Sequence, residues 1–341
     1  MNIILTLLIL SILVVVHEYG HYITARIFHV KIVEFAVGMG PVILSRSKNK
    51  IKYSLRALPF GGFNRFADPL VDDEDVQLEN GQVYLKDAKI WQRTIIFFAG
   101  SLFNIILAAI IVISIYFSLG VPASNGLVGS VMQGSPAQIA GIKENDIIIA
   151  VDGLATKNWE SISQAITNNK NESFKLDVLR NNEIIQVSLT PQNDKENNRK
   201  TIGVYLGVIK WQLWDSIKYG IIQIFAVSTM MIKLFIEMII GKTGVELMGP
   251  VGMISVVGSA VKEGLVSIFS FAAILSMNFA VINLFPLPAL DGSKILLLGV
   301  EKLRGKALPP EKEGIFHLVG FAFFIILTII IAYKDIVNLI K

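Results

Sequence analysis

The segment VVHEYGHYIT, residues 15–24, places two histidines and a glutamate within a strongly apolar stretch. His17 and His21 are four positions apart, so a helix brings both imidazoles to one face, about 6 Å apart along its axis. That arrangement suits two imidazole ligands of one metal ion, with Glu18 beside them to take a proton from water. Ionisable groups are costly at membrane depth and persist there for a function, which favours a metal site over a chance pattern.

A catalytic zinc site uses three protein ligands, so the sequence must supply one more. Asp291, in NFAVINLFPLPALDGSKI, is the best placed, because it lies at the end of a later apolar stretch. A helix cap or a membrane boundary is the alternative role for such an acid. The chain has no cysteine, so thiolate ligands and disulfides are excluded. The other possible ligands are less well placed: His29 lies beyond Arg26 at the membrane edge, His317 could equally face lipid headgroups, and Glu237 and Glu246 lie on the expected outer side.

The composition of the 341-residue chain is that of a membrane protein. Hydrophobic residues make up 53% and charged residues 17%, with a mean hydropathy of +0.59. A soluble protein would have about 45–50% apolar and about 25% charged residues. The formal net charge of +4 is modest and indicates no nucleic-acid partner.

Four stretches are long and apolar enough to cross a bilayer, for which roughly 20 residues are needed. The first leads into the histidines without a basic leader or a small-residue cleavage site, so we expect a retained span and not a signal peptide. Lysines and arginines gather after the first span, before the second, and between the third and fourth, which predicts cytoplasmic connections there. The predicted organisation is a transmembrane helix over 1–26, a cytoplasmic loop over 27–93 with a β-hairpin at 51–66, a transmembrane helix over 94–119, an extracytoplasmic domain over 120–206, an interfacial amphipathic helix and loop over 207–264, a transmembrane helix over 265–292, a cytoplasmic loop over 293–314 and a transmembrane helix over 315–334.

The stretch 217–240 is apolar but carries Lys218, Lys233 and Glu237. If it crossed the membrane, the third span would run outward and leave Asp291 on the opposite side from the two histidines. A ligand some 20 Å from the ion cannot bind it, because zinc–oxygen contacts are about 2 Å. A metal site that includes Asp291 therefore requires 217–240 to lie along the outer surface, with its charged residues turned to water.

Residues 121–206 contrast with the apolar spans. Short apolar runs alternate with turn signals there, and Asn181-Asn182 between two alternating stretches predicts a β-hairpin. The stretch GSPAQIAGIKENDIIIAVDG resembles the PDZ domains of bacterial membrane-associated proteases. PDZ domains bind extended peptides by adding a strand to a sheet edge, so the resemblance implies peptide ligands. A spacer on the outer face is the alternative.

HEYGH and NLFPLPALDG together resemble the site-2 protease family of intramembrane metalloproteases, in particular the bacterial members that cleave anti-sigma factors and signal-peptide remnants. The family pattern is H-E-x-x-H in one span and N-x-x-P-x-P-x-L-D-G in a later one, and both are complete here. The resemblance covers nearly the whole chain, with room for one PDZ domain. It implies one zinc ion per chain held by His17, His21 and Asp291, with Glu18 as the catalytic base.

Weaker matches to the same family indicate where a substrate would bind. A helix in lipid hides its scissile amides in its own hydrogen bonds, so cleavage requires local unwinding and replacement partners for the freed groups. The stretch 51–66 resembles a β-hairpin that dips back toward the site, whose edge would pair with unwound substrate. An ordinary glycine-rich turn is the alternative for PFGGF. The prolines after the third span would end its helix and turn Asp291 toward the metal. The candidate substrate-binding residues are Asn283, Pro286, Pro288, Phe60, Gly61, Gly62 and Asn104.

The sequence therefore predicts a polytopic α-helical membrane protein with four transmembrane helices, an inserted mixed α/β PDZ domain and a membrane-associated β-hairpin on the cytoplasmic side. The expected activity is zinc-dependent cleavage of single-span membrane proteins, near the cytoplasmic face of the bacterial cytoplasmic membrane. Membrane lipids and PDZ-bound peptides are the other expected partners. The alternatives are a catalytically idle PDZ scaffold and a channel or transporter with a metal site at membrane depth. Serine and aspartyl intramembrane proteases are disfavoured because neither G-x-S-G nor G-x-G-D occurs.

Overall fold

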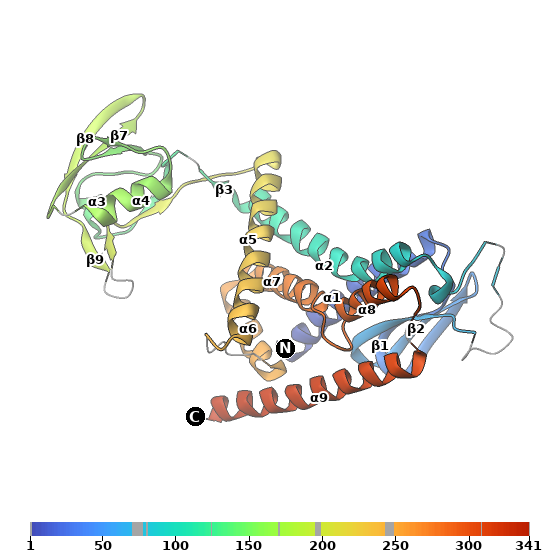
Figure 1. The fold of residues 1–341 in the computed structure, drawn as a ribbon. Coiled ribbons are helices and arrows are strands. Elements are labelled where there is room, and N and C mark those ends of the chain that lie inside the picture. The colour runs from blue at the N-terminus through green and yellow to red at the C-terminus, as the bar shows by residue number, and fades with distance from the viewer. Residues whose placement is uncertain are drawn as a thin grey trace. The chain divides into compact units, whose positions relative to one another are not determined.

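A computed structural model divides the chain into two compact units (Figure 1). The first unit comprises Met1–Val112 and Gly220–Lys341, and the second comprises Ile113–Tyr219, so the second is an insertion in the first. The residues that the structure describes are 2–69, 78–79, 81–123, 125–169, 171–194, 199–242, 249–307 and 309–340.

Among the described residues, five helices are long and apolar enough to cross a membrane, judged by length and composition. Four of them overlap the four predicted spans. The fifth is α5, which contains the stretch predicted to lie along the outer surface. The helices outside the small strand-rich insertion are α1 (Asn2–Ile27), α2 (Ile90–Leu119), α5 (Leu213–Ile239), α6 (Pro250–Glu263), α7 (Leu265–Asn283), α8 (Asp291–Arg304) and α9 (Pro310–Ile340).

Close packing joins α1, α2 and α7. A Cβ atom on Gly20 of α1 would lie 2.4 Å from the carbonyl oxygen of Ala99 in α2, so only glycine allows this approach. Small residues permit the same close contact between helices in membranes generally. Ser276 of α7 donates a hydrogen bond to the carbonyl oxygen of Asn104 in α2 at 2.8 Å. An apolar cluster joins α1 to α6 and α7; its buried members are Ile9, Leu13, Val257 and Ala272.

The connection between α1 and α2 contains a β-sheet. β1 (Ile32–Lys48) and β2 (Ile51–Phe66) meet at a tight turn, where Lys48 pairs with Ile51. The first residues of β1 alternate between buried and half-buried positions, as in a strand with one covered face. The predicted limits of the hairpin are therefore wrong, because 51–66 is one long strand and its partner is 32–48.

Both strands bend, and the bends widen the sheet. Residues 34–37 pair with 52–55 on one side and with 62–65 on the other. Burial acts to raise the pKa of Glu34, but hydrogen bonds from Ser54 and Arg56 outweigh burial and hold it below its usual value. Its carboxylate thus ties two neighbouring segments together in the charged form. The order of segments across the sheet is 42–48, 51–56, 34–37 and 62–66, which leaves 62–66 at an edge of the described sheet.

The chain turns sharply after α7. α7 ends at Asn283, and α8 begins at Asp291 and continues to Arg304. The predictions of a span reaching 292 and of a loop over 293–314 are therefore wrong. Pro286 disfavours helix in the residue before it, and a separate helix starts beyond the prolines. Arg93 of α2 and Glu301 of α8 form a mostly buried ion pair, which fastens this helix to α2.

Helix α5 packs on α2 and α7 through Ile224, Val227 and Met231. Figure 1 shows that the part of α5 in the first unit is not parallel to α2 or α7. Lys218 is exposed, but Ile222, one turn further on, is exposed too.

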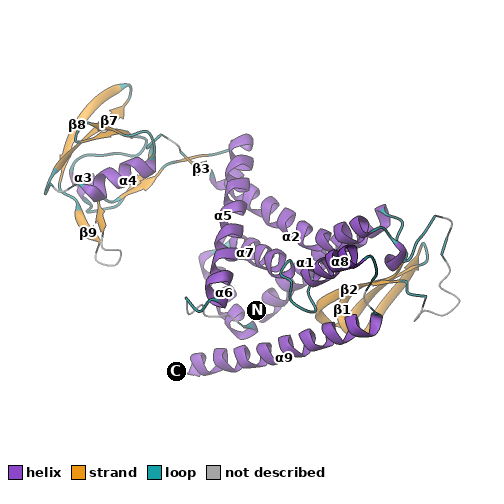
Figure 2. Ribbon diagram, viewed as in Figure 1, coloured by secondary structure: helices purple, strands orange, loops and turns teal. Residues whose placement is uncertain are grey.

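Between the end of α2 and the start of α5, the described residues of the inserted unit form short strands and two helices around their own apolar core (Figure 2). The predicted hairpin is confirmed by the pairing of β7 with β8, and its two turn residues, Asn181 and Asn182, have φ values of 49° and 67°. The main sheet has the order β6-β5-β7-β8. The elements are β3 (Val121–Pro122), β4 (Val128–Val131), α3 (Pro136–Ile139), β5 (Ile147–Val151), β6 (Leu154–Ala155), α4 (Trp159–Asn168), β7 (Phe174–Arg180), β8 (Glu183–Leu189), β9 (Gln192–Asp194), β10 (Arg199–Thr201), β11 (Val204–Leu206) and β12 (Val208–Ile209).

Candidate metal centre

The two histidines of α1 and Asp291 of α8 meet inside the first unit. Nε2 of His17 and Nε2 of His21 each lie 3.0 Å from Oδ2 of Asp291 and 3.1 Å from each other. The three residues are only 6–7% exposed. In the part of the chain that the structure describes, they form the one group of three His, Asp or Glu residues with converging ligand atoms.

These separations suit the ligands of one tetrahedral ion. Two ligands of a tetrahedral zinc ion, each about 2.0–2.1 Å from the metal, are about 3.3 Å apart. Nδ1 of His21 lies 2.7 Å from the carbonyl oxygen of Ile96, which can only accept, so Nδ1 carries a proton; in the neutral imidazole that binds a metal, Nε2 then presents a lone pair. That lone pair faces a carboxylate oxygen of Asp291, an arrangement that a cation between them stabilises.

The second oxygen of Asp291 has its own partner. Nζ of Lys294, one helical turn further along α8, lies 3.3 Å from Oδ1. The same ammonium lies 5.0 Å from the centre of the Phe97 ring, which helps to hold it in place. Oδ2 of Asp291 is thus the oxygen that faces His17 and His21.

Gly100 of α2 provides the space that an ion needs. A Cβ atom on Gly100 would lie 2.4 Å from Nε2 of His21 and 2.7 Å from Cε1 of His17. Any side chain here would enter the space beside the ligand atoms. Sequence reasoning missed the roles of Gly100 and Gly20, because a glycine in an apolar helix carries no chemical signal of its own. The converging donors and this open space fit a bound zinc ion.

The chain reaches Asp291 through a compact turn. A Cβ atom on Gly292 would lie 2.2 Å from the carbonyl oxygen of Leu284, so glycine is required where α8 starts against the end of α7. Ala289 has a φ of 72°, and its N–H donates to Nδ1 of His317 at 3.2 Å. His317, considered as a ligand from the sequence, therefore braces the turn from α9 instead.

The remaining ligand candidates do not join the cluster. His29 lies just beyond the end of α1, with a φ of 58°, and its carbonyl oxygen accepts from Val83. Glu237 lies on α5, 3.9 Å from Nζ of Lys233. Glu246 lies outside the described residues.

Glu18 lies between the two histidines in sequence and is half-buried. Nδ2 of Asn64, on β2, donates to the carbonyl oxygen of Glu18 at 2.7 Å and to its Oε2 at 2.8 Å. Asn64 was not singled out from the sequence, although it lies within the stretch 51–66. The only sequence feature that could have pointed to Asn64 is that it is a polar residue directly after PFGGF.

The predicted substrate-binding residues lie in three places: on β2, on α2, and at the end of α7 with the turn after it. Gly61 and Gly62 lie on β2, and a Cβ atom on Gly62 would be 3.5 Å from Cγ of Glu18. The side chain of Phe60 lies outside the described residues. Asn104 is fully buried on α2, one turn beyond Gly100, and neither of its amide atoms has a hydrogen-bond partner among the described residues. Asn283 and Pro288 are half-buried at the end of α7 and in the turn after it, and Pro286 is exposed.

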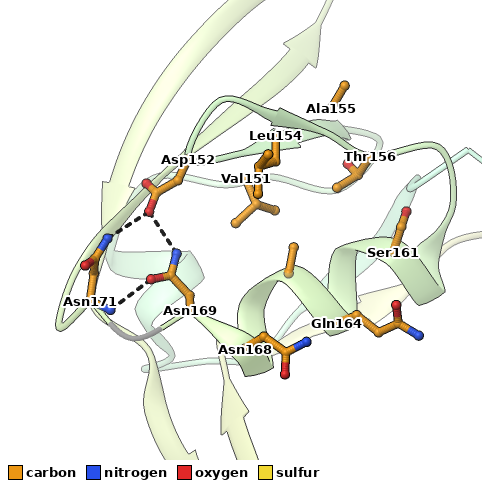
Figure 3. Close-up of a pocket in the computed structure, with 11 residues that line it drawn as sticks. Val151, Asp152, Leu154, Ala155, Thr156, Ser161, Gln164, Asn168, Asn169 and Asn171 are labelled. Atoms are coloured by element: carbon orange, nitrogen blue, oxygen red, sulfur yellow. Dashed lines mark hydrogen bonds between the residues drawn. The ribbon is translucent and has the colours of Figure 1, made fainter.

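Two hollows lie in the inserted unit. A cavity of about 510 Å³ lies between the β5–β6 hairpin and α4, and Figure 3 shows Asp152 at its rim, hydrogen-bonded to Asn169 and Asn171. A smaller one of about 150 Å³ lies on the other side of α4; among its lining residues are Trp159, Ile162, Ile166, Lys200 and Val204.

Two imidazoles and a carboxylate buried among apolar helices, with a half-buried glutamate next to one of the histidines, define a membrane metallopeptidase. The chain matches the family described as peptidase family M50 over residues 5–327 and belongs to this family of zinc metallopeptidases. It is an integral membrane protein with an inserted strand-rich unit.

Relatives align with nearly the whole chain. It is 33% identical to a protein of Clostridium acetobutylicum whose name describes a zinc metalloprotease, over 98% of this chain and 97% of that protein. It is 28% identical to the regulator of sigma-W protease RasP of Bacillus subtilis, with the same coverage. It is 30% identical to the protease Eep of Enterococcus faecalis, over 98% of each chain. Among solved structures, it is similar to the PDZ domain of an SdrC-like protein from Listeria monocytogenes, at 24% identity and a TM-score of 0.22, over 25% of this chain and 90% of that one.

Proposed function

We propose that this chain is a zinc-dependent intramembrane endopeptidase that cleaves single-span membrane proteins, of the anti-sigma-factor or signal-peptide-remnant type. The observation that carries the proposal is the convergence of His17, His21 and Asp291 beside Glu18, within helices that are apolar enough to lie in lipid. The name of the Bacillus subtilis relative, which describes a regulator of sigma-W, supports the substrate class.

His17, His21 and Asp291 would hold one zinc ion per chain, and zinc bound there would polarise the scissile carbonyl and acidify a water molecule. The carboxylate of Glu18 takes the proton from the attacking water and returns it to the leaving amine. Asn104 is the candidate donor to the developing negative oxygen, because its fully buried amide has no partner within the described chain.

The substrate would lie along the edge segment 62–66. An unwound stretch has lost its helical hydrogen bonds, and a sheet edge supplies both donors and acceptors to replace them. Support comes from the hydrogen bond of Asn64 to Glu18 and from the orientation of Gly62, whose added Cβ would lie 3.5 Å from Cγ of Glu18. Asn283, at the end of α7, is a further candidate partner for substrate backbone.

The inserted unit would bind an extended peptide as PDZ domains do. The hollow beside α4 runs along residues 200–204, which include an end of β10 and the start of β11. A peptide there would add a strand next to those residues. This role would select substrates or delay their entry, because the candidate catalytic residues all lie outside the insertion.

We further propose that four helices cross the membrane and that α5 does not. The turn after α7 carries Asp291 to the level of His17 and His21, so α7 would start on the side where α2 ends. If α5 crossed, α6 would have to return, but α6 has 14 residues. A helix of that length spans about 21 Å, whereas the hydrocarbon core is about 30 Å thick. The insertion would then be extracytoplasmic and the metal centre near the cytoplasmic face.

Single cysteines test this topology, because the chain has none. Cysteines at the exposed positions Lys242 and Ser259 should both react with an impermeant reagent added outside intact cells, and one at Arg304 should not. Protection of Lys242 together with labelling of Arg304 would overturn the proposed arrangement. Labelling of all three after the membrane is permeabilised is the control for reactivity.

The proposed activity is tested with the purified full chain and a single-span model substrate in lipid. Removal of zinc by a chelator should abolish cleavage, and about one equivalent of zinc per chain should restore it. Cleavage that persists without zinc would contradict the proposed chemistry. Zinc binding without cleavage of any model span would favour the idle scaffold, and zinc flux across vesicles would favour the transporter.

A further inference from the structure

We propose that Asn64 is a positioning residue that holds the carboxylate of Glu18 for proton transfer, a role that rests on the proposed peptidase function. The two residues are 46 positions apart, on β2 and α1. The amide nitrogen of Asn64 donates to the carbonyl oxygen of Glu18 at 2.7 Å and to its Oε2 at 2.8 Å. One side chain thus binds both the main chain and the carboxylate of the base.

The chemistry of the contact fixes its direction. Both atoms of Glu18 can only accept hydrogen bonds, so the amino group of Asn64 must face them and the oxygen must point away. A hydrogen bond to an ionised carboxylate is roughly twice as strong as one between neutral groups. With Oε2 engaged, Oε1 is the oxygen left to take a proton. The glutamate side chain would otherwise move freely about several torsions, which the shared donor restricts.

A second observation shows that the same strand faces the base. A Cβ atom added to Gly62 would lie at ordinary van der Waals distance from α1, 3.5 Å from Cγ of Glu18 and 3.6 Å from Cγ1 of Val14. Gly62 and Asn64 are two positions apart, and alternate residues of a strand face the same side. This face of the edge segment 62–66 is therefore turned toward Glu18, which it contacts through the side chain of Asn64.

The oxygen of the Asn64 amide, unlike its nitrogen, makes no hydrogen bond with the described residues. Oδ1 of Asn64 is buried and has no hydrogen-bond partner in the described residues. Buried polar atoms with a purely structural role are nearly always paired. The side chain of Asn64 donates to Glu18 and its oxygen accepts from no described group. We therefore assign it a role in positioning the base and not in stabilising the sheet. The element proposed to receive substrate thereby also sets the position of the base.

The test compares Asn64→Leu and Asn64→Asp with the wild-type full chain, loaded with zinc, on a single-span substrate. Leucine is close in size but has no donor, and aspartate has the same shape but puts an acceptor against the carboxylate. We expect kcat to fall about 10- to 100-fold in Asn64→Leu, the scale of one lost hydrogen bond to a charged group. KM should change less than twofold, zinc content should be unchanged, and Asn64→Asp should be at least as slow.

Ser47→Leu, at an exposed position on the opposite edge segment of the sheet, is the matched control and should leave kcat unchanged. A kcat of Asn64→Leu within twofold of wild type, or full activity of Asn64→Asp, would refute the positioning role. Loss of zinc or of thermal stability in both variants would show a structural role instead and would equally overturn the proposal.

An infrared measurement tests the same contact without activity, so the result is separate from the fate of the proposed function. The difference spectrum between wild type and Asn64→Leu should contain a carboxylate stretching band. The same comparison made in a Glu18→Gln background should lack that band. If the band is absent in the first comparison, or present in both, Asn64 does not act on Glu18.

Discussion

The Glu18→Gln variant is expected to bind zinc as the wild type does and to cleave at least about 100-fold more slowly. General-base catalysis contributes about 10²–10⁴-fold, and glutamine cannot take a proton from water. The metal ligands are untouched, and the glutamine oxygen can still accept from Asn64, so the local geometry is kept. Zinc content by elemental analysis and initial cleavage rates of a single-span substrate measure the two effects.

Glu183→Gln provides the matched control, because Glu183 is exposed on β8 in the inserted unit. It should cleave at the wild-type rate. A drop of less than tenfold in Glu18→Gln would argue against its role as the base. Loss of zinc from that variant would mean that Glu18 supports the metal centre rather than the proton transfer.

Gly100→Ala is expected to lower zinc affinity and activity by at least about 100-fold. The new Cβ would lie 2.4 Å from Nε2 of His21, well inside van der Waals contact, so an imidazole or α2 must move. Displacement of a catalytic group by about 1 Å can cost about 10²-fold in rate. Competition with a zinc chelator measures the affinity, and the same preparation gives the rate.

Helix propensity alone predicts the opposite effect for Gly100→Ala, so the two explanations can be distinguished. Alanine is favoured over glycine inside a helix by about 1 kcal/mol, so the substitution would stabilise α2 if only the helix mattered. Gly299→Ala, on α8, is the matched control, because no described atom beyond the neighbouring backbone of its own helix lies within 4 Å of its added Cβ. It should keep wild-type zinc affinity. Normal zinc binding by Gly100→Ala would show that α2 does not bound the metal position.

Much of this protein can be read from short stretches of sequence, where neighbours along the chain interact. The four-residue spacing of His17 and His21 puts them on one face of any helix, whatever surrounds it. Apolar runs long enough to span a bilayer identify the membrane helices in the same way. The Asn181-Asn182 turn predicts its hairpin because the backbone of two residues decides it.

The sequence predictions were wrong where the structure of a segment depends on residues far away in the chain. The stretch 51–66 has the composition of strands, but only pairing with 32–48 reveals that it is one strand and part of a wider, bent sheet. The residues after Asp291 read as a basic loop, yet the pairing of Glu301 with Arg93 holds them as a helix against α2. Neither partner can be identified from periodicity, which reports only on residues a few positions apart.

By itself, the sequence determined the membrane class, the two histidines with their glutamate, and the inserted strand-rich unit. Only the tertiary structure decided that Asp291, 274 positions from His17, lies 3.0 Å from it. It also decided that Gly20 and Gly100 are needed for space and that Asn64 binds Glu18. The reason is physical: these roles depend on how closely separate elements approach, and that distance is set by packing between segments remote in the chain.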